Sequence, residues 1–552
     1  MQDSSSARAI RAAVLSVYEN LMWAASEPEE EEARGALVDD SLAPLAVEGS
    51  LQLVMERNMR TNAIDYGARV VADPYCKRED WYVTPTTVLP APVSKRLYDA
   101  AARATLSMTR LIDAVATDYA WLAETYAELA KTDDWTRRML ELARLGADDG
   151  DALRCHVLRS DYMLDDESGS VVQIETNTFA ASLAGPAAAA TKAHRRILGK
   201  YGGFSNEDLD EALPRNGAPE GLADGLAAAL RAYEARFCLE ESSSIAEKKR
   251  RPVVLFVTVA EEDNELCHRQ LERQLFDAHG IVSLRRTVRQ LIREGKGHHR
   301  EGPLELFLLA CDDSSETVEV GVAYFRLCAW ERCAGDHGWA VREALARAQC
   351  VEVPSAAAHL AGLKRAQVEW SRVSGLDRLK RKLSAEDKSI ILQVAATQFA
   401  LDKADEARQA AYLLMDTSAA YVAKAARDGL LDLPHIFDRH DILARCTHDN
   451  NRGALVVQAL ARPRPRPSLV LGNASEAIVR SSVPELGIFA VALHSGTLEL
   501  LPPTIVGHLL RSKHADTKDG GLCRGNAMVD SPLIFDDDNN KKDDNDDDNM
   551  EP

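Results

Sequence analysis

The spacing of apolar residues changes along this chain and indicates which segments are helices and which are strands. In residues 92–144 apolar side chains recur every three or four positions, which predicts amphipathic helices. Residues 154–177 contain two β-rich runs joined by the turn-forming sequence DDESG, which predicts a hairpin. An alanine-rich helix is expected near residues 185–198, and charged helical sequence occupies residues 206–249.

The pattern changes at residue 251, where buried strands begin to alternate with helices. Strand patterns occur in RPVVLFVTV, IVSLRRT, LELFLLAC, VEVGVAYFR and CVEVP, and helical patterns follow the first and the fourth. This alternation predicts a small parallel α/β domain across residues 251–354. Helices return in residues 356–429, and the last part holds short strand patterns such as SLVLGN, LGIFAVALH and TLELLP. The predicted fold class is mixed α/β (α+β).

The composition is that of a globular protein, because 46% of the 552 residues are hydrophobic and 28% are charged. A formal net charge of −20 disfavours binding to nucleic acid through a broad basic surface. No apolar run is long enough to span a bilayer, and the N-terminal sequence lacks the features of a secretory signal, so we expect no membrane insertion. The ten cysteines form no C-x-x-C pair, which fits a reducing compartment, and a cytoplasmic protein is expected.

The second strand of the predicted hairpin, QIETN, carries the first candidate chemistry. Alternate residues of a strand share a face, so Glu175 and Asn177 should point one way while Val172 and Ile174 face the core. A carboxylate beside an amide oxygen suits Mg²⁺, which prefers oxygen ligands. Arg159 on the paired strand could face an anionic ligand nearby. The same alternation also fits an ordinary half-buried strand with a polar solvent side.

Two further places concentrate polar residues. If GHLLRSK is a strand, Arg511 and Lys513 share one face, and the glycine turn after Asp519 could help them cradle a phosphate or carboxylate. A turn after an edge strand fits that sequence equally well. Arg326 ends the strand VAYFR, and the acidic residues 260–264 end the first strand of the same predicted domain. Ligands of such sheets bind beyond the carboxyl ends of the strands, so a cleft is expected there.

Taken together and in this order, these segments resemble eukaryotic glutathione synthetases. The matching sequences are RSDYM, QIETNT, HLAGLKRAQ, PELGIF, and VGHLLRSK followed by DGG. The resemblance implies an ATP-grasp architecture with an inserted parallel α/β substrate-binding domain and a lid region. It implies a helical part with the first half of the core in residues 1–250, the inserted domain in residues 251–366, and the remaining core and lid in residues 367–535. The acidic tail, residues 536–552, lies outside the resemblance, and its polar composition predicts disorder.

The resemblance also implies an activity, which is the ligation of γ-glutamylcysteine to glycine with ATP as co-substrate and Mg²⁺ as cofactor. The reaction would pass through an acyl phosphate of the dipeptide, and no protein nucleophile is required. The protein must instead align the reactants and neutralise phosphate charge. A homodimer in the cytoplasm is the form that the resemblance implies, with no nucleic acid or membrane partner.

Site residues carried over from the family fall into four groups. Arg159 and Arg511 are expected to be catalytic, and the metal ligands are expected to be Glu175, Asn177 and Asp449. The residues expected to contact the dipeptide or glycine are Arg159, Phe179, Ala180, Ala181, Ser182, Glu262, Asp263, Asn264, His268, Arg326, Ala329, Arg511, Leu522 and Cys523. The residues expected to contact ATP are Glu175, Lys364, Arg445, Asn451, Leu471, Glu485, Lys513 and Asp519.

This chain departs from the family pattern in the lid. Where the family has a lysine, a glutamate, three glycines and two asparagines, residues 445–451 read RCTHDNN, so Arg445 takes the place of the lysine and Asp449 that of the metal-binding glutamate. A loop of this kind should close over the γ-phosphate, and without its glycines the acyl phosphate could meet water. Outside the resemblance, the polar run at residues 444–453 predicts only a loop.

Substitutions also affect the substrate side. Ala180, His268 and Ala329 replace other family residues, and Leu522 and Cys523 replace the small pair after DGG, which bears on selectivity for glycine. Two other functions therefore remain open. The chain could be a ligase that uses another acceptor amino acid, or a non-catalytic homologue that binds the dipeptide or stabilises a partner subunit. An error in the gene sequence around residues 446–463 would also produce the altered lid.

Overall fold

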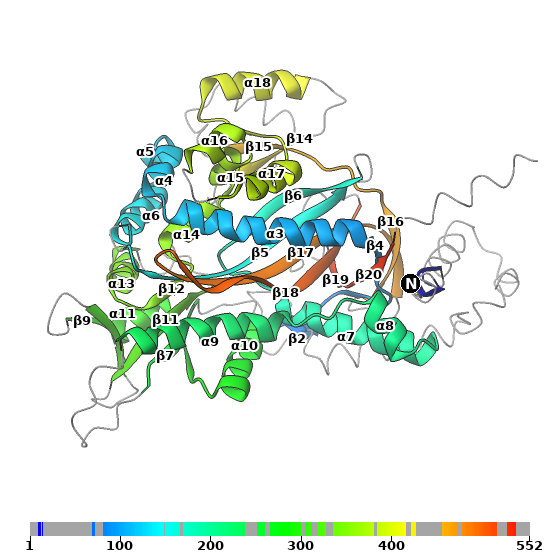
Figure 1. The fold of residues 1–552 in the computed structure, drawn as a ribbon, viewed down its shortest axis with the longest axis horizontal. Coiled ribbons are helices and arrows are strands. Elements are labelled where there is room, and N and C mark those ends of the chain that lie inside the picture. Colours follow the sequence, from blue (N-terminus) through cyan, green and yellow to red (C-terminus); the bar gives the residue numbers. More distant parts are fainter. Residues whose placement is uncertain are drawn as a thin grey trace, which may run out of the picture.

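The computed structural model of the chain describes residues 9–12, 14, 69–71, 81–147, 150–165, 169–237, 251–259, 265–299, 305–310, 317–326, 335–379, 383–415, 421–426, 455–471, 477–515 and 527–536. These residues form a mixed α/β structure built around a seven-stranded sheet (Figure 1). None of the described helices is long and apolar enough to cross a membrane.

The central sheet has the order β16-β3-β19-β18-β17-β5-β6, and its neighbouring strands are antiparallel except for β19 and β3. Long alternating sequences make its middle, where β17 and β18 form a hairpin that turns at Gly496, whose φ of +57° suits glycine. The strands are β3 (Thr86–Thr87), β5 (Leu153–Asp165), β6 (Ser170–Asn177), β16 (Arg466–Leu471), β17 (Ala477–Ser495), β18 (Leu498–His514) and β19 (Ala527–Asp530).

Helices cover both faces of the central sheet (Figure 1). On one face lies α3 (Lys95–Ala116), which begins where the Ser94 side chain accepts a hydrogen bond from the Leu97 backbone N–H. It packs with Leu158, Tyr162 and other apolar residues in one core. On the other face lie α7 (Ala184–Tyr201) and α9 (Ala218–Phe237), whose alanines and leucines pack with Val157 and Phe489 in a second core. The helices predicted near residues 92–144, 185–198 and 206–249 are therefore confirmed in large part.

A second sheet has the order β8-β7-β11-β10-β9, with β12 also paired to β11. Strands β7, β8, β11 and β12 run parallel, as the alternating pattern predicts. The prediction of a parallel domain is wrong for β10, which contains the pattern LELFLLAC and runs antiparallel to both β9 and β11. The prediction missed β9 because its sequence, GKGHH, has no apolar alternation. The elements are β7 (Val253–Thr258), α10 (Glu265–His279), β8 (Ser283–Thr287), α11 (Val288–Glu294), β9 (Gly295–His299), β10 (Glu305–Ala310), β11 (Thr317–Phe325), α13 (Gly335–Arg347) and β12 (Val351–Val353).

A third sheet, of three antiparallel strands in the order β13-β15-β14, lies with α18 at one end of the structure (Figure 1). Residues 356–429 were expected to be helical throughout, but they contain β13 and β14, which are short and, in the case of β14, rich in alanine. The elements here are α14 (Ala356–Gly362), α15 (Lys364–Trp370), α16 (Val373–Arg378), α17 (Ala385–Val394), β13 (Gln398–Ala400), α18 (Ala404–Met415), β14 (Tyr421–Ala425) and β15 (Leu455–Ala459).

The remaining elements lie around these sheets. Two small sheets pair β1 with β2 and β4 with β20, and short helices follow α3 and α7. Their bounds are β1 (Arg69–Val71), β2 (Trp81–Val83), β4 (Ala91–Ser94), α4 (Tyr119–Tyr126), α5 (Leu129–Thr132), α6 (Asp134–Leu145), α8 (Asn206–Ala212) and β20 (Pro532–Phe535).

Candidate active site

The β5–β6 hairpin places the predicted metal-binding face, and a β-bulge sets its alternation. Asp161 pairs with Glu175 and the next residue, Tyr162, pairs with Gln173, so Ile174 is an extra residue between them. Glu175 and Asn177 therefore share a face, as predicted. The prediction that Val172 and Ile174 face the core is wrong, because the bulge shifts the alternation and the buried residues of β6 are Val171, Gln173 and Thr176.

Asp161 lies at the centre of this face and joins three elements. Its carboxylate is 1% exposed and accepts two hydrogen bonds from Arg159, from Nε at 2.6 Å and from Nη2 at 2.8 Å. Asn177 Nδ2 donates to it at 3.0 Å, and Arg511 Nη2, from β18, donates at 3.2 Å. Asp161 is not among the predicted site residues, although it stands two residues after Arg159 on the same face of a strand.

Glu175 is held by a lysine from a different part of the fold. Lys364 is the first residue of α15, and its Nζ lies 2.6 Å from Glu175 Oε2. Burial by itself raises the pKa of Glu175, but Lys364, Lys424 and Arg511 lower it well below its usual value. The carboxylate is therefore ionised at neutral pH and available as a hard anionic ligand.

A glycine allows the approach of Lys364 to the hairpin. Gly362, at the end of α14, lies so close to β6 that an added Cβ would meet Thr178 Oγ1 at 2.4 Å and the Thr176 carbonyl oxygen at 3.0 Å. A larger residue would therefore push α14 and the start of α15 away from Glu175. In the sequence HLAGLKRAQ, the glycine thus lets the chain approach β6 closely enough for the lysine to reach Glu175.

Lys424 also belongs to this cluster, and sequence analysis missed it. It lies on β14, and its pKa is lowered from 10.5 to about 7, chiefly by burial and then by the positive charge of Lys364, which Glu175 only partly opposes. The signal that could have found it is the strand pattern YVAKA, in which a lysine stands among apolar residues.

Arg511 and Lys513 lie at alternate positions of β18, as the strand pattern predicts. Arg511 is the direct neighbour of Glu485 on β17, and its Nη2 forms an ion pair with that carboxylate. Burial alone raises the pKa of Glu485, but Arg511 and Lys513 lower it below the usual value. Burial disfavours the charge on Arg511, yet Glu485, Asp161 and Glu175 raise its pKa. Both cations thus act on Glu485, and Arg511 acts on Glu175 as Lys364 does.

The predicted dipeptide side is a tight loop held by two arginines. Arg159 Nη1 donates to the carbonyl oxygen of Ser182 at 2.9 Å, and Arg326 Nη1, at the end of β11, donates to that of Ala181 at 3.2 Å. Ala180 and Leu183 have positive φ values of 50° and 71°, so the backbone turns sharply here. The loop links the central sheet to the second sheet.

Two further predicted residues lie beside this loop. His268, on α10, is 1% exposed, and its Nε2 accepts a hydrogen bond from Arg326 Nε at 2.8 Å. Arg326 Nη1 also donates to the Tyr324 hydroxyl at 2.7 Å. Burial, then the positive charge of Arg326, holds the pKa of His268 far below its usual value. Phe179 stacks on the His359 ring, with the ring centres 4.4 Å apart.

The structure therefore brings together the predicted residues on β5, β6, α15, β17 and β18, and it connects Arg326 and His268 to them through the loop. Leu471 ends β16, and nothing is described of its side chain. The predicted site residues that lie outside the described residues are Glu262, Asp263, Asn264, Ala329, Arg445, Asp449, Asn451, Asp519, Leu522 and Cys523.

Comparison with known proteins gives the family. A model of the family described as "Eukaryotic glutathione synthase, ATP binding domain" matches residues 52–534. The chain belongs to this family. Among similar proteins, the glutathione synthetase of Rattus norvegicus is 28% identical over 455 residues, which cover 81% of this chain and 89% of that protein. The glutathione synthetase of Xenopus laevis is 26% identical over 505 residues, covering 90% and 97%. A chloroplastic glutathione synthetase of Arabidopsis thaliana is 26% identical over 459 residues, covering 81% of this chain and 78% of that protein.

A solved structure shares the fold of this glutathione synthase family member. It is the glutathione synthetase-like effector GSS30 of Globodera pallida in its apo form, with a TM-score of 0.65 and 18% sequence identity. The match covers 88% of this chain and 98% of the effector. The resemblance inferred from RSDYM, QIETNT and VGHLLRSK is thereby confirmed at the level of the family and its mixed α/β fold.

Proposed function

We propose that this chain is an ATP- and Mg²⁺-dependent ligase that joins γ-glutamylcysteine to glycine through an acyl phosphate. The observation that carries the proposal is the meeting of Glu175 and Asn177 with cations from separate elements, on α15, β14 and β18. Such a cluster combines hard oxygen ligands with positive charge, which is what transfer of a phosphoryl group requires. Membership of the glutathione synthase family supports the same assignment.

The residues of the β6 face fit Mg²⁺. Glu175 is ionised, and Asn177 Nδ2 donates to Asp161 and, at 3.3 Å, to Glu175, so the amide oxygen is the atom that Asn177 could offer to a metal. Glu175 and Asn177 would hold the ion, with Asp449 as the third expected ligand. When bound, Mg²⁺ neutralises phosphate oxygens and orients the transferred group.

The cations of the site divide into two groups in this proposal. Lys364, Lys424 and Lys513 would bind the phosphates of ATP, since all three act on the carboxylates Glu175 or Glu485. Lys364 now neutralises Glu175 at 2.6 Å and would exchange part of that contact for phosphate. Glu485, Arg445, Asn451, Leu471 and Asp519 complete the proposed nucleotide set.

Arginines would bind the dipeptide. Arg511 and Arg159 lie on either side of Asp161, and Arg326 holds the neighbouring loop, so guanidinium groups line one region. A carboxylate fits a guanidinium fork well. The cysteine carboxylate of the dipeptide would take the γ-phosphoryl group of ATP, and ADP would leave. The neutral amine of glycine would then attack the acyl carbon, which releases phosphate. Arg159 and Arg511 are proposed to hold the reacting carboxylate during both steps.

The finer architecture belongs to the same proposal. We assign an ATP-grasp core to residues 1–250 and 367–535, with an inserted substrate-binding domain in residues 251–366. The three-stranded sheet that carries Lys424 would be part of the lid, because it brings a lysine over the carboxylates of the central sheet. A cytoplasmic homodimer is the proposed form of the protein.

A ligase with a different acceptor is the second candidate, and a specific observation favours it. The residues after DGG are Leu522 and Cys523 instead of the small pair expected for glycine, and the 445–451 segment lacks the lid glycines. Either change alters the space in which an acceptor amine must approach. A protein that binds the dipeptide without turnover would follow from the same lid change if closure fails.

The purified full chain, incubated with ATP, MgCl₂, γ-glutamylcysteine and glycine, tests the proposal when ADP and tripeptide are both measured. We expect the two products in equal amounts and none without the dipeptide. ADP without tripeptide, restored to equality by serine or β-alanine, would favour the second candidate. An absence of ADP, with dipeptide binding retained in calorimetry, would reject the ligase and leave the binding protein. The Glu175→Gln variant controls for contaminating ATPases.

A further inference from the structure

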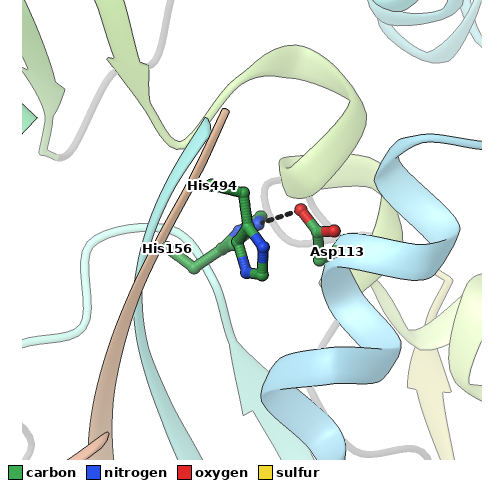
Figure 2. A group of neighbouring side chains, drawn as sticks. All are labelled: Asp113, His156 and His494. Atoms are coloured by element: carbon green, nitrogen blue, oxygen red, sulfur yellow. Dashed lines mark hydrogen bonds and ion pairs between the residues drawn. The ribbon is translucent and has the colours of Figure 1, made fainter. Parts of the chain in front are cut away.

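Three polar side chains meet on the face of the central sheet that is opposite to the candidate active site. His156 lies on β5 and His494 on β17, while Asp113 lies on α3 (Figure 2). His156 and Leu158 are two residues apart on β5 and point to the same face, where Leu158 packs against α3. Arg159 points to the opposite face, toward the proposed substrate. The group is therefore separate from the residues used above.

The three side chains are close enough to share one ion. His156 Nε2 lies 2.9 Å from Asp113 Oδ1, and one potential ligand atom from each residue lies within 4.8 Å of the others. Figure 2 shows both imidazoles projecting from neighbouring strands toward the carboxylate on α3. The His156 side chain is 3% exposed, His494 is 5% exposed and the Asp113 side chain is 16% exposed.

His494 has a buried nitrogen that the described part of the chain does not satisfy. Its Nε2 is inaccessible to solvent and has no hydrogen-bond partner among the described residues. Leaving such a group unpaired costs on the order of 1–3 kcal/mol. His494 contacts the His156 ring edge on, with the ring centres 5.8 Å apart.

We propose that Asp113, His156 and His494 bind a divalent transition-metal ion, with Zn²⁺ as the best match. Two imidazoles and one carboxylate are a common donor set for such ions, whereas Mg²⁺ and Ca²⁺ prefer oxygen ligands only. Metal–ligand bonds of about 2.0–2.1 Å in a tetrahedron separate the ligand atoms by roughly 3.3 Å. The separations in the cluster, 2.9 Å for the closest pair and at most 4.8 Å overall, bracket that spacing.

Arg154 acts on the cluster from outside. Its Nε lies 2.8 Å from Asp113 Oδ1 and its Nη2 lies 3.2 Å from Oδ2, while Nη2 also donates to the Gly496 carbonyl oxygen at 2.8 Å. A metal on Oδ1 would replace the Nε contact, and the Nη2 contact to Oδ2 would orient the carboxylate as outer partners of metal ligands do. Arg154 also lines a cavity of about 290 Å³ beside the cluster.

The fourth position is open to water or to Glu499. Glu499 is exposed and pairs directly with His494 across β17 and β18, so both side chains leave the sheet on the same face. A bound ion would tie α3 to the middle of the sheet from one side, three residues from Arg159 on β5. This site does not depend on the proposed ligase activity.

Metal-free full chain, titrated with Zn²⁺ in a calorimeter in the presence of excess Mg²⁺, tests the site. We expect one zinc ion per chain, with an affinity that falls at least about 100-fold in His494→Ala and in His156→Ala. The control variant is His279→Ala, which removes a half-buried histidine that pairs with Asp224 at another place in the structure, and it should bind zinc as the native chain does. Glu175→Gln should also leave zinc binding unchanged.

Cobalt substitution answers the question without any variant. Co²⁺ bound to the native chain should give the visible absorption of a tetrahedral site with nitrogen and oxygen ligands. Less than one tight zinc ion per chain, or a His494→Ala variant that folds and binds zinc with native affinity, would overturn the proposal. If His494→Ala does not fold, an octahedral cobalt spectrum or no cobalt binding in the native chain would overturn it instead.

Discussion

Lys424 provides a test of the site that depends on charge alone. Its pKa is lowered from 10.5 to about 7, with burial as the main cause, so the side chain loses its proton near neutral pH in the empty protein. If Lys424 binds phosphate, ATP must find it protonated. Binding of the nucleotide should therefore weaken as pH rises through about 7.

The expected size follows from that pKa. With a pKa of about 7 in the empty site, roughly nine-tenths of Lys424 is protonated at pH 6 and about one-tenth at pH 8. The affinity for ATP should thus fall about tenfold between these pH values, and about tenfold more by pH 9, since each pH unit corresponds to about 1.4 kcal/mol. Above pH 7, binding of ATP should also be accompanied by the uptake of a proton by Lys424.

Stability should change with pH in the opposite sense. Because the folded pKa lies below that of the unfolded chain, the unfolded state binds more protons at Lys424 between about pH 7 and about pH 10.5. The penalty is complete below pH 7, with an upper limit of about 5 kcal/mol, and disappears toward pH 10.5. We expect Lys424→Met to raise the free energy of unfolding at pH 6 and to raise it less at pH 9.

Calorimetric titration with a non-hydrolysable ATP analogue and Mg²⁺, from pH 6 to pH 9, measures the binding effect. Lys424→Arg is the matched control, because a guanidinium stays protonated over this range. The pH dependence that remains in this variant comes from other groups, such as the phosphates of the nucleotide. A native affinity that follows the same pH dependence as Lys424→Arg would refute the role of Lys424. Urea unfolding of Lys424→Met shows whether such a result arises because Lys424 does not bind phosphate or because its pKa is not lowered. A variant that is no more stable than the native chain at pH 6 would contradict the lowered pKa.

Three further changes test other parts of the site. Glu175→Gln removes the anionic metal ligand, so turnover should fall at least about 100-fold and should need more Mg²⁺; a native Mg²⁺ dependence in rate measurements would contradict this. Arg511→Ala should weaken γ-glutamylcysteine binding by about 1.5–3 kcal/mol in calorimetry, as expected for a charged hydrogen bond, and unchanged affinity would remove the residue from the dipeptide site. Gly362→Ala places a Cβ 2.4 Å from Thr178 Oγ1 and should lower the free energy of unfolding in urea by about 1–3 kcal/mol. It should also weaken ATP binding, because Lys364 moves with α14. Native stability and native ATP affinity would show that α14 does not determine the position of Lys364.

The sequence was sufficient where local pattern decides structure. The hairpin of residues 154–177 and the alternation of Arg511 with Lys513 follow from strand periodicity, and the structure confirms both. Family motifs carried the assignment of Glu175 and Lys364, which pair across a long stretch of chain at 2.6 Å. Periodicity alone could not have predicted this contact, because the pattern of each segment carries no information about which distant segment it packs against.

The failures have physical causes of the same kind. The bulge at Ile174 depends on how β6 pairs with β5, so residues 172–174 alone could not reveal which side chains are buried. Lys424 was missed because β14 is a five-residue strand within alanine-rich sequence, where helix and strand patterns are ambiguous. The cluster of Asp113, His156 and His494 exists only because α3 crosses the sheet at that point.

The most direct test of the ligase account follows an oxygen atom. γ-Glutamylcysteine labelled with ¹⁸O in its cysteine carboxylate is turned over with ATP, Mg²⁺ and glycine, and mass spectrometry measures the label in the phosphate released. The account predicts one ¹⁸O atom in each phosphate and one tripeptide for each ADP, because the carboxylate oxygen leaves with the phosphoryl group. Unlabelled phosphate, formed while ADP accumulates, would mean that water and not the dipeptide receives the phosphoryl group at this site.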